Sequence, residues 1–133
     1  MLGISRNPSA EILERINPRI SYLSEIALEE EEQESLSNDS YLGLVNFLNR
    51  IYDLSLVPVL GLTYEGNIRA HWRSSPDERL ALEFLDSFDL KFVFFYPDSY
   101  DPTKVLRISG SGSVLSFLED YPRAWEFLRR LDD

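Results

Sequence analysis

The chain of 133 residues contains no cysteine and only one histidine, His71. The absence of cysteine excludes disulfide bonds and thiolate chemistry, and any mechanism that needs an imidazole base must use His71. No apolar run approaches the roughly 20 residues of a membrane span. The first residues also lack the apolar core of a signal peptide. We therefore expect a cytoplasmic protein.

Basic residues are also scarce, since 13 lysines and arginines face 23 aspartates and glutamates, which gives a formal net charge of -10. A field of this sign repels phosphate backbones and argues against a nucleic-acid partner. Residues 25–39 contain seven acids and no base. This acidic segment is either a dock for a basic partner or a solvated helix end. The docking interpretation gives the partner-binding candidates Glu29, Glu30, Glu31, Glu32 and Glu34.

No metal site is expected in the acidic segment, because it lacks the alternating ligands and the glycine of a calcium loop. The length fits a single domain, 1–133, whose first 53 residues read as helices. Asn7 and Pro8 predict a helix start, and Asn17 with Pro18 predicts its end. A second helix is predicted from about Arg19, and a third after the polar cluster at 38–40.

Residues 58–108 predict an antiparallel β-meander of about four to five strands, because apolar and polar residues alternate between turn signals. The expected strands are 59–63, 68–73, 79–85, 90–96 and a short one at 105–108. Residues 109–113, rich in glycine and serine, predict a turn, and 113–131 predict helices. The fold class is therefore α+β, with C-terminal helices packed on one sheet face.

Two groups of residues fall on the side of the meander opposite its main apolar stripe. Arg69, His71 and Arg73 alternate with apolar residues and form a candidate anion site or an ordinary solvated face. Val93 and Phe95 form an exposed apolar strip with Leu85 if helices cover one face only. If both faces are covered, these residues are core, and the sequence leaves the two alternatives open.

The hairpin residues Thr63, Glu65-Gly66, Ile68 and Trp72 follow the pattern T-x-E/D-G-x-I-x-x-x-W. This β-meander resembles a group of small bacterial proteins of unassigned function, some encoded beside toxin-like genes. The resemblance covers about a third of the chain. It implies an antitoxin or immunity-like binding protein and carries over no catalytic residue.

No catalytic set accompanies these patterns. His71 alternates with arginines rather than with a nucleophile, and the glycines at 110 and 112 lack the lysine of a phosphate-binding loop. We expect no catalytic residue, no cofactor and no enzyme. The leading hypothesis is an acidic, non-enzymatic protein-binding module, an antitoxin or immunity-like inhibitor of a basic partner. The alternatives are a small-ligand protein or enzyme that uses Arg69, His71 and Arg73, and a structural subunit, with a homodimer possible.

Overall fold

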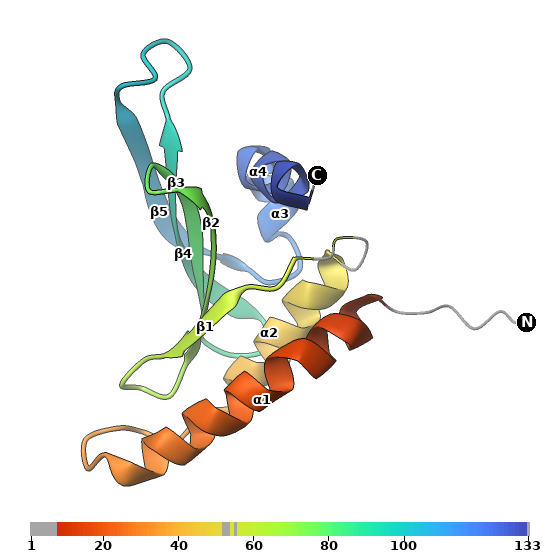
Figure 1. The fold of residues 1–133 in the computed structure, drawn as a ribbon, viewed down its shortest axis with the longest axis vertical. Coiled ribbons are helices and arrows are strands. Elements are labelled where there is room, and N and C mark those ends of the chain that lie inside the picture. Colours follow the sequence, from red (N-terminus) through yellow and green to blue (C-terminus); the bar gives the residue numbers. More distant parts are fainter. Residues whose placement is uncertain (1–7, 52–53, 55, 133) are drawn as a thin grey trace, which may run out of the picture.

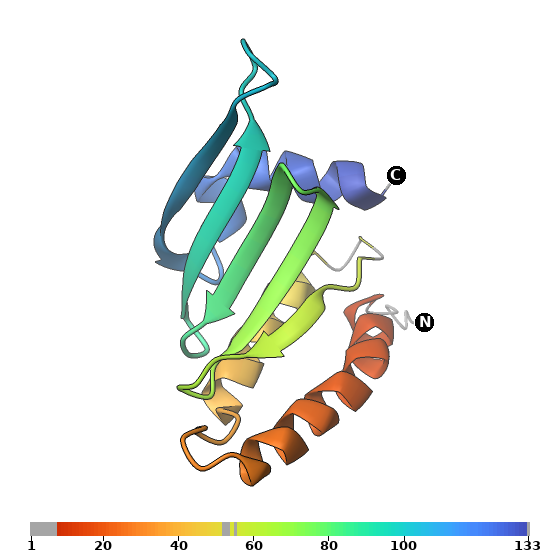
Figure 2. The same ribbon diagram turned by 60° about the vertical axis from the view of Figure 1, so that its left-hand side comes forward.

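The computed structural model describes residues 8–51, 54 and 56–132. It confirms the α+β class, with two N-terminal helices, a five-stranded antiparallel sheet and C-terminal helices (Figures 1 and 2). The strands lie in the sheet in chain order, each paired with the next. The elements are α1 (Pro8–Glu29), α2 (Asn38–Arg50), β1 (Val59–Leu62), β2 (Ile68–Ser75), β3 (Glu78–Phe84), β4 (Asp89–Pro97), β5 (Val105–Ser113), α3 (Phe117–Asp120) and α4 (Pro122–Asp132).

Helix α1 continues through Pro18, so the predicted break at Asn17 and Pro18 is wrong. An internal proline costs a helix about 3 kcal/mol. Burying one large aliphatic side chain returns about 1.5–3 kcal/mol, and α1 buries several along one stripe. Ile12, Ile16 and Leu23 lie in the core, whereas Pro18 is exposed. The packing of that stripe therefore outweighs the proline. The predicted start at Asn7 lies outside the described residues.

All helices lie on one side of the sheet (Figure 1). The side chains that the sheet buries beneath them share one strand face and join the core of α1, α2 and α4. From the strands these are Leu60, Ile68, Ala70, Trp72, Leu80, Leu82, Phe84, Leu90, Phe92 and Phe94.

Helix α2 is fastened to the sheet by the buried hydroxyl of Ser40. The hydroxyl donates to the carbonyl of Phe84 at 2.5 Å and accepts from the N–H of Ile68 at 2.8 Å, which joins α2 to β3 and β2. Gly43 then lets the helix approach closely, because a Cβ there would lie 2.2 Å from the carbonyl oxygen of Asp86. These two contacts hold α2 flat against the end of the sheet.

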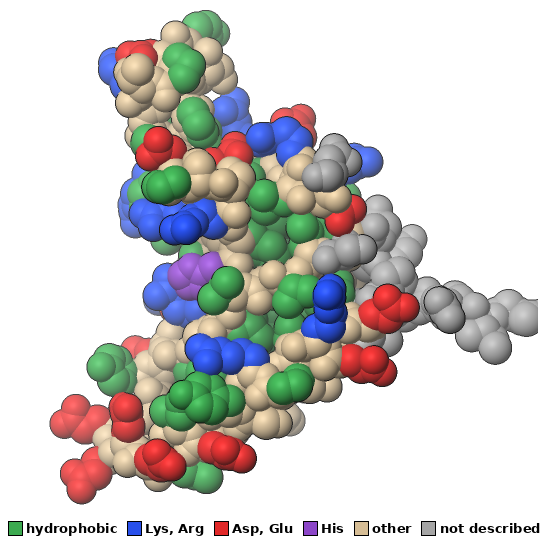
Figure 3. Space-filling view, in the orientation of Figure 1, with side chains coloured by type: hydrophobic (Ala, Val, Ile, Leu, Met, Phe, Trp, Pro, Cys, Tyr) green, Lys and Arg blue, Asp and Glu red, His purple; other side chains and the backbone are tan. Residues whose placement is uncertain are grey.

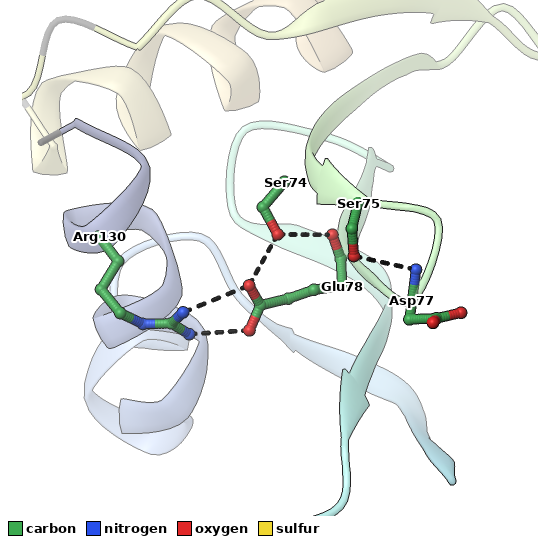
Figure 4. Close-up of polar contacts among 5 residues, drawn as sticks. All are labelled: Ser74, Ser75, Asp77, Glu78 and Arg130. Atoms are coloured by element: carbon green, nitrogen blue, oxygen red, sulfur yellow. Dashed lines mark hydrogen bonds and ion pairs between the residues drawn. The ribbon is translucent and has the colours of Figure 1, made fainter. Parts of the chain in front are cut away.

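Helix α4 is held to the β2–β3 hairpin by one ion pair (Figure 4). The guanidinium of Arg130 donates to both carboxylate oxygens of Glu78, at 3.3 and 2.8 Å, and Ser74 donates to the same carboxylate at 2.7 Å. Partial burial of Glu78 opposes ionisation, but the hydrogen bonds from Arg130 and Ser74 prevail and lower the pKa of Glu78. The burial of Ala124, Phe127 and Leu128 in the shared core places α4 on the same side as α1 and α2, and the ion pair adds a contact near its C-terminal end.

Strand β5 runs from Val105 to Ser113, so the turn predicted at 109–113 is wrong. Gly110 lies opposite Phe92 and Gly112 opposite Leu90 in the β4–β5 ladder. A Cβ at Gly110 would contact the ring of Phe92 at 3.4 Å, so the glycine lies directly against this ring. Backbone pairing with β4 thus overrides the local turn preference of the Gly-Ser repeat.

Replacing Ser40 by alanine should destabilise the fold by about 1–3 kcal/mol, because a buried N–H and a buried carbonyl each lose a partner. Urea unfolding of Ser40→Ala and of Ser21→Ala, at an exposed position of α1, provides the measurement and its control. A midpoint for Ser40→Ala equal to that of the control would contradict the assigned role.

Candidate functional site

No described helix covers the second face of the sheet, which decides between the two alternatives that the sequence leaves open. Figures 1 and 2 show that α1, α2, α3 and α4 all lie on the opposite side. Val93 and Phe95 lie on this second face and are only half-buried, although they sit on β4 near the middle of the molecule. No described helix is placed to bury them further.

The uncovered face carries most of the cations of the sheet. We call it the basic face and define it by the exposed side chains of Arg69, His71, Arg73, Arg79, Lys91 and Arg107. The ladder register places them in rows across the strands, since side chains of paired residues stand on one face. One row runs Arg73, Arg79, Phe95, Arg107, and another runs Arg69, Glu83, Lys91. Figure 3 shows Lys and Arg side chains gathered beside the histidine on this side.

Among the described residues, these cations form no ion pair, although the ladder places Glu83 between Arg69 and Lys91. Within the described ranges, the ion pairs are Arg50 with Glu119 and Arg130 with Glu78, and neither involves the basic face. The one carboxylate in the middle of the face, Glu83, accepts instead from the side-chain amide of Asn67 at 3.1 Å. Moreover, Arg73 and Arg79 lie directly opposite each other, and like charges so placed destabilise a sheet. This arginine pair therefore opposes the stability of the sheet at one position of the face.

Phe95 is the aromatic centre of the basic face. The guanidinium carbon of Arg79 lies 4.4 Å from the centroid of its ring, and that of Arg107 lies at 5.9 Å. Cation–π contacts of this kind hold the arginine stems over the ring. The guanidinium N–H groups of Arg79 then remain available to an acceptor.

Two open hollows lie on the basic face. One has a volume of about 280 Å³ and is lined by Arg69, His71, Arg79 and Arg107 around a floor that includes Ala81, Val93 and Phe95. The other, of about 370 Å³, is lined by Arg69, Lys91, Glu83 and residues of β5. Of the predicted anion site, the structure brings Arg69 and His71 together. Arg73 lines a different cavity, with His71 and Arg79, beside β1.

The positive charge of the basic face affects the pKa of its histidine, His71. Partial burial of the imidazole, and then the positive charges of Arg69 and Arg79, lower the pKa of His71 below its ordinary value of 6.5. The lowered pKa favours the neutral imidazole of His71, which can both donate and accept a hydrogen bond. An anion bound nearby would stabilise the protonated ring and raise this pKa.

The predicted acidic residues form a separate surface, the acidic turn, at the end of α1. Glu29, Glu30, Glu31, Glu32 and Glu34 are all exposed. The turn is held on the β1–β2 hairpin, because the N–H of Glu34 donates to the carbonyl of Tyr64 at 2.9 Å and that of Ser37 to the carbonyl of Gly66 at 2.8 Å. Gly66 has a φ of 84°, and a Cβ there would lie 2.2 Å from the carbonyl oxygen of Ser35. The structure thus separates acidic and basic surfaces on one small domain.

Sequence reasoning placed Arg69, His71, Val93 and Phe95 on this face but omitted Lys91 and Arg107 from the candidate site. Lys91 follows from the same period-two alternation as Phe95. Arg107 lies within the predicted strand 105–108, but its place on this face depends on the register in which β5 pairs with β4, where it lies opposite Phe95. Chemically, the face offers cationic donors around an apolar floor. Among the described residues there is no group of three or more metal ligands and no helix able to cross a membrane.

The histidine should report this environment. We expect the imidazole of His71 to titrate below pH 6.5, and the pKa to rise in Arg69→Gln, because one neighbouring positive charge is removed. The folded state resists protonation, so the stability contributed by neutral His71 should be lost as the pH falls from 6.5 through its folded pKa. Proton NMR of the single histidine, with Arg15→Gln as a distant control, measures the shift. An identical pKa in both variants would contradict the account.

Comparisons with protein-family models, with curated proteins and with solved structures found no match. The resemblance of the Thr63–Trp72 hairpin pattern to small bacterial proteins stays an interpretation of the sequence.

Proposed function

We propose that this protein is a non-enzymatic binding module that holds an acidic segment of a protein partner on its basic face. One observation carries the proposal. Five lysines and arginines stand around a single carboxylate, Glu83, on a sheet face that no described helix covers, and none of them forms an ion pair in the described parts of the chain, although the protein is acidic overall. A partner that supplies the missing carboxylates would remove the repulsion between Arg73 and Arg79.

The chemistry of the face favours carboxylates beside apolar groups. Arginine side chains bind carboxylates through paired N–H donors, and Arg79 is already oriented by Phe95. Ala81 and Val93 lie between the rows of cations and offer apolar contact. Successive side chains of an extended segment point to opposite sides, so residues i, i+2 and i+4 share one side. A segment that carries both carboxylates and small apolar groups on the side turned to the sheet therefore matches both features of the face.

Other anions fit less well. Nucleic acid approaches against the field of a molecule with a net charge of -10. A small anion would use only part of a face that spans four strands, and neither hollow encloses it. The binding test below therefore compares the acidic peptide with nucleic acid and with a small anion.

A short glutamate-rich peptide should bind the basic face, and binding should weaken as salt rises. Arg69→Gln with Arg107→Gln should weaken it roughly tenfold, because two exposed charge contacts are lost. Isothermal titration calorimetry gives the affinity, and the NMR signal of His71 reports whether the peptide occupies the face.

The matched control carries Arg15→Gln with Arg129→Gln, which changes the net charge equally at exposed positions off the basic face. If both double variants lose affinity equally, the effect depends only on net charge, and this result would contradict the proposal. If a single-stranded oligonucleotide or inorganic phosphate binds more tightly at the same residues, that ligand, and not an acidic peptide, is the partner of the basic face.

The acidic turn supports a second candidate function, an antitoxin or immunity-like inhibitor of a basic partner. Its exposed glutamates are fastened to the hairpin by backbone hydrogen bonds, so they present a defined surface rather than a loose tail. A concentrated negative surface accelerates association with a basic protein and orients it. The hairpin resemblance to proteins encoded beside toxin-like genes favours the same candidate.

Glu30→Gln with Glu31→Gln should slow the association of a lysine-rich probe peptide, with a difference that disappears at high salt. Stopped-flow fluorescence of a labelled peptide measures the rate. The control is Glu11→Gln with Glu14→Gln, at exposed positions of α1. If both pairs change the rate equally, the acidic turn has no special part in binding.

A further inference from the structure

Strand β5 forms one margin of the sheet (Figure 2). It pairs with β4 over its whole length, Val105–Ser113, with no register shift. The opposite margin of the sheet is β1, and α1 packs beside it. There the side chain of Arg19 donates to the outward carbonyl of Leu60 at 3.3 Å. No described helix covers the margin at β5 in this way.

The register shows which backbone groups of β5 point outward. At the two ends of the ladder, the N–H of Asp98 donates to the carbonyl of Lys104 and the N–H of Val114 to the carbonyl of Phe88. Hydrogen-bonded pairs alternate along an antiparallel ladder. The even-numbered residues of β5 therefore bond to β4, and the odd-numbered ones turn their N–H and C=O groups outward. These are Val105, Arg107, Ser109, Ser111 and Ser113.

The outward edge carries one charged side chain, Arg107, and otherwise lacks the usual devices against strand pairing. It contains no proline, no lysine and no bulge, and it is nine residues long. Val105 and Leu106 are 42% and 38% exposed, which is high for large apolar side chains in a sheet. In the described part of the chain, no hydrogen bond to the outward backbone groups is present. The edge is therefore suited to receive another strand.

The side chains of β5 fit those of a second copy of the same strand that runs antiparallel to it. If a two-fold axis passes beside Ser109, each strand runs antiparallel to its copy and the outward groups of Ser109 face each other. The larger side chains then meet glycines, because Leu106 lies opposite Gly112 and Ile108 opposite Gly110. These are non-hydrogen-bonded pairs, in which side chains approach most closely. On the other face, Arg107 lies opposite Ser111, so no like charges meet.

We propose that β5 pairs with β5 of a second copy about a two-fold axis at Ser109, which joins the two sheets into one. The interface is isologous and closes on itself, so it yields a dimer and not a filament. The proposed partner is a second copy rather than an unrelated strand, because an antiparallel copy of β5 places a glycine opposite each of Leu106 and Ile108. The two basic faces then form one continuous surface, with Phe95 and Arg107 near the seam.

Light scattering across a concentration series should give twice the mass of one chain at high concentration. Ser109→Lys places two like charges opposite each other at the axis and should raise the dissociation constant roughly tenfold or more. Ser109→Thr keeps the backbone and the charge and should remain dimeric. Thermal unfolding of dilute samples verifies that both variants are folded. A wild-type chain that stays monomeric throughout, or a Ser109→Lys variant that dimerises as well as the wild type, overturns the proposal.

The register has a separate test, because any disulfide in a variant of this cysteine-free chain must join two copies. Hydrogen-bonded partners lie about 5.5 Å apart at Cα, within the range of a disulfide. Ser109→Cys should therefore form a covalent dimer under mild oxidation faster than Ser99→Cys, in the exposed loop before β5. Equal rates at the two positions would refute pairing about Ser109.

Discussion

The structure depends on a one-sided burial of its sheet. Every described helix packs against the same face, and this face holds the aromatic and aliphatic core. The buried hydroxyl of Ser40 fixes the geometry at one end by joining α2 to β2 and β3. At the other end, the bidentate contact between Arg130 and Glu78 holds α4. Because α2 and α4 lie on the same side at the two ends of the sheet, the second face is left to contact solvent or a partner.

This constraint explains the unusual distribution of charge. A solvated sheet face usually pairs its charges across strands. Here Glu83 lies between Arg69 and Lys91 and accepts from Asn67, whereas Arg73 lies opposite Arg79, a residue of the same charge. Local arrangements that oppose stability are typical of functional surfaces. The acidic turn, fastened on the β1–β2 hairpin near Gly66, keeps its own exposed glutamates apart from the basic face (Figure 3). A small domain thereby presents two surfaces of opposite sign, each suited to a different class of partner.

The alternation of residues on β2, β3 and β4 made most of the fold predictable, because a period of two identifies a half-buried strand from local sequence alone. The errors arose where tertiary packing overrode a local signal. Pro18 stayed within α1 because Ile12 and Ile16 are buried, and the glycines of β5 stayed within the ladder because Gly110 lies against Phe92. The side chains of Val93 and Phe95 were placed on the correct face, but their exposure depended on where helices distant in sequence would pack. No local pattern distinguishes Ser40, since its role depends on contacts with residues 28 and 44 positions away.

The most direct test of a cationic, uncovered sheet face compares solvent paramagnetic relaxation by an anionic and a cationic cosolute at each backbone amide. We expect the anionic cosolute to accumulate beside the amides of Arg69, His71 and Val93, and the cationic one to accumulate beside residues 29–34. Protection of the sheet amides from both cosolutes would show that the face is covered in solution. Preference of the cationic cosolute for these sheet amides would contradict the assignment of a basic face.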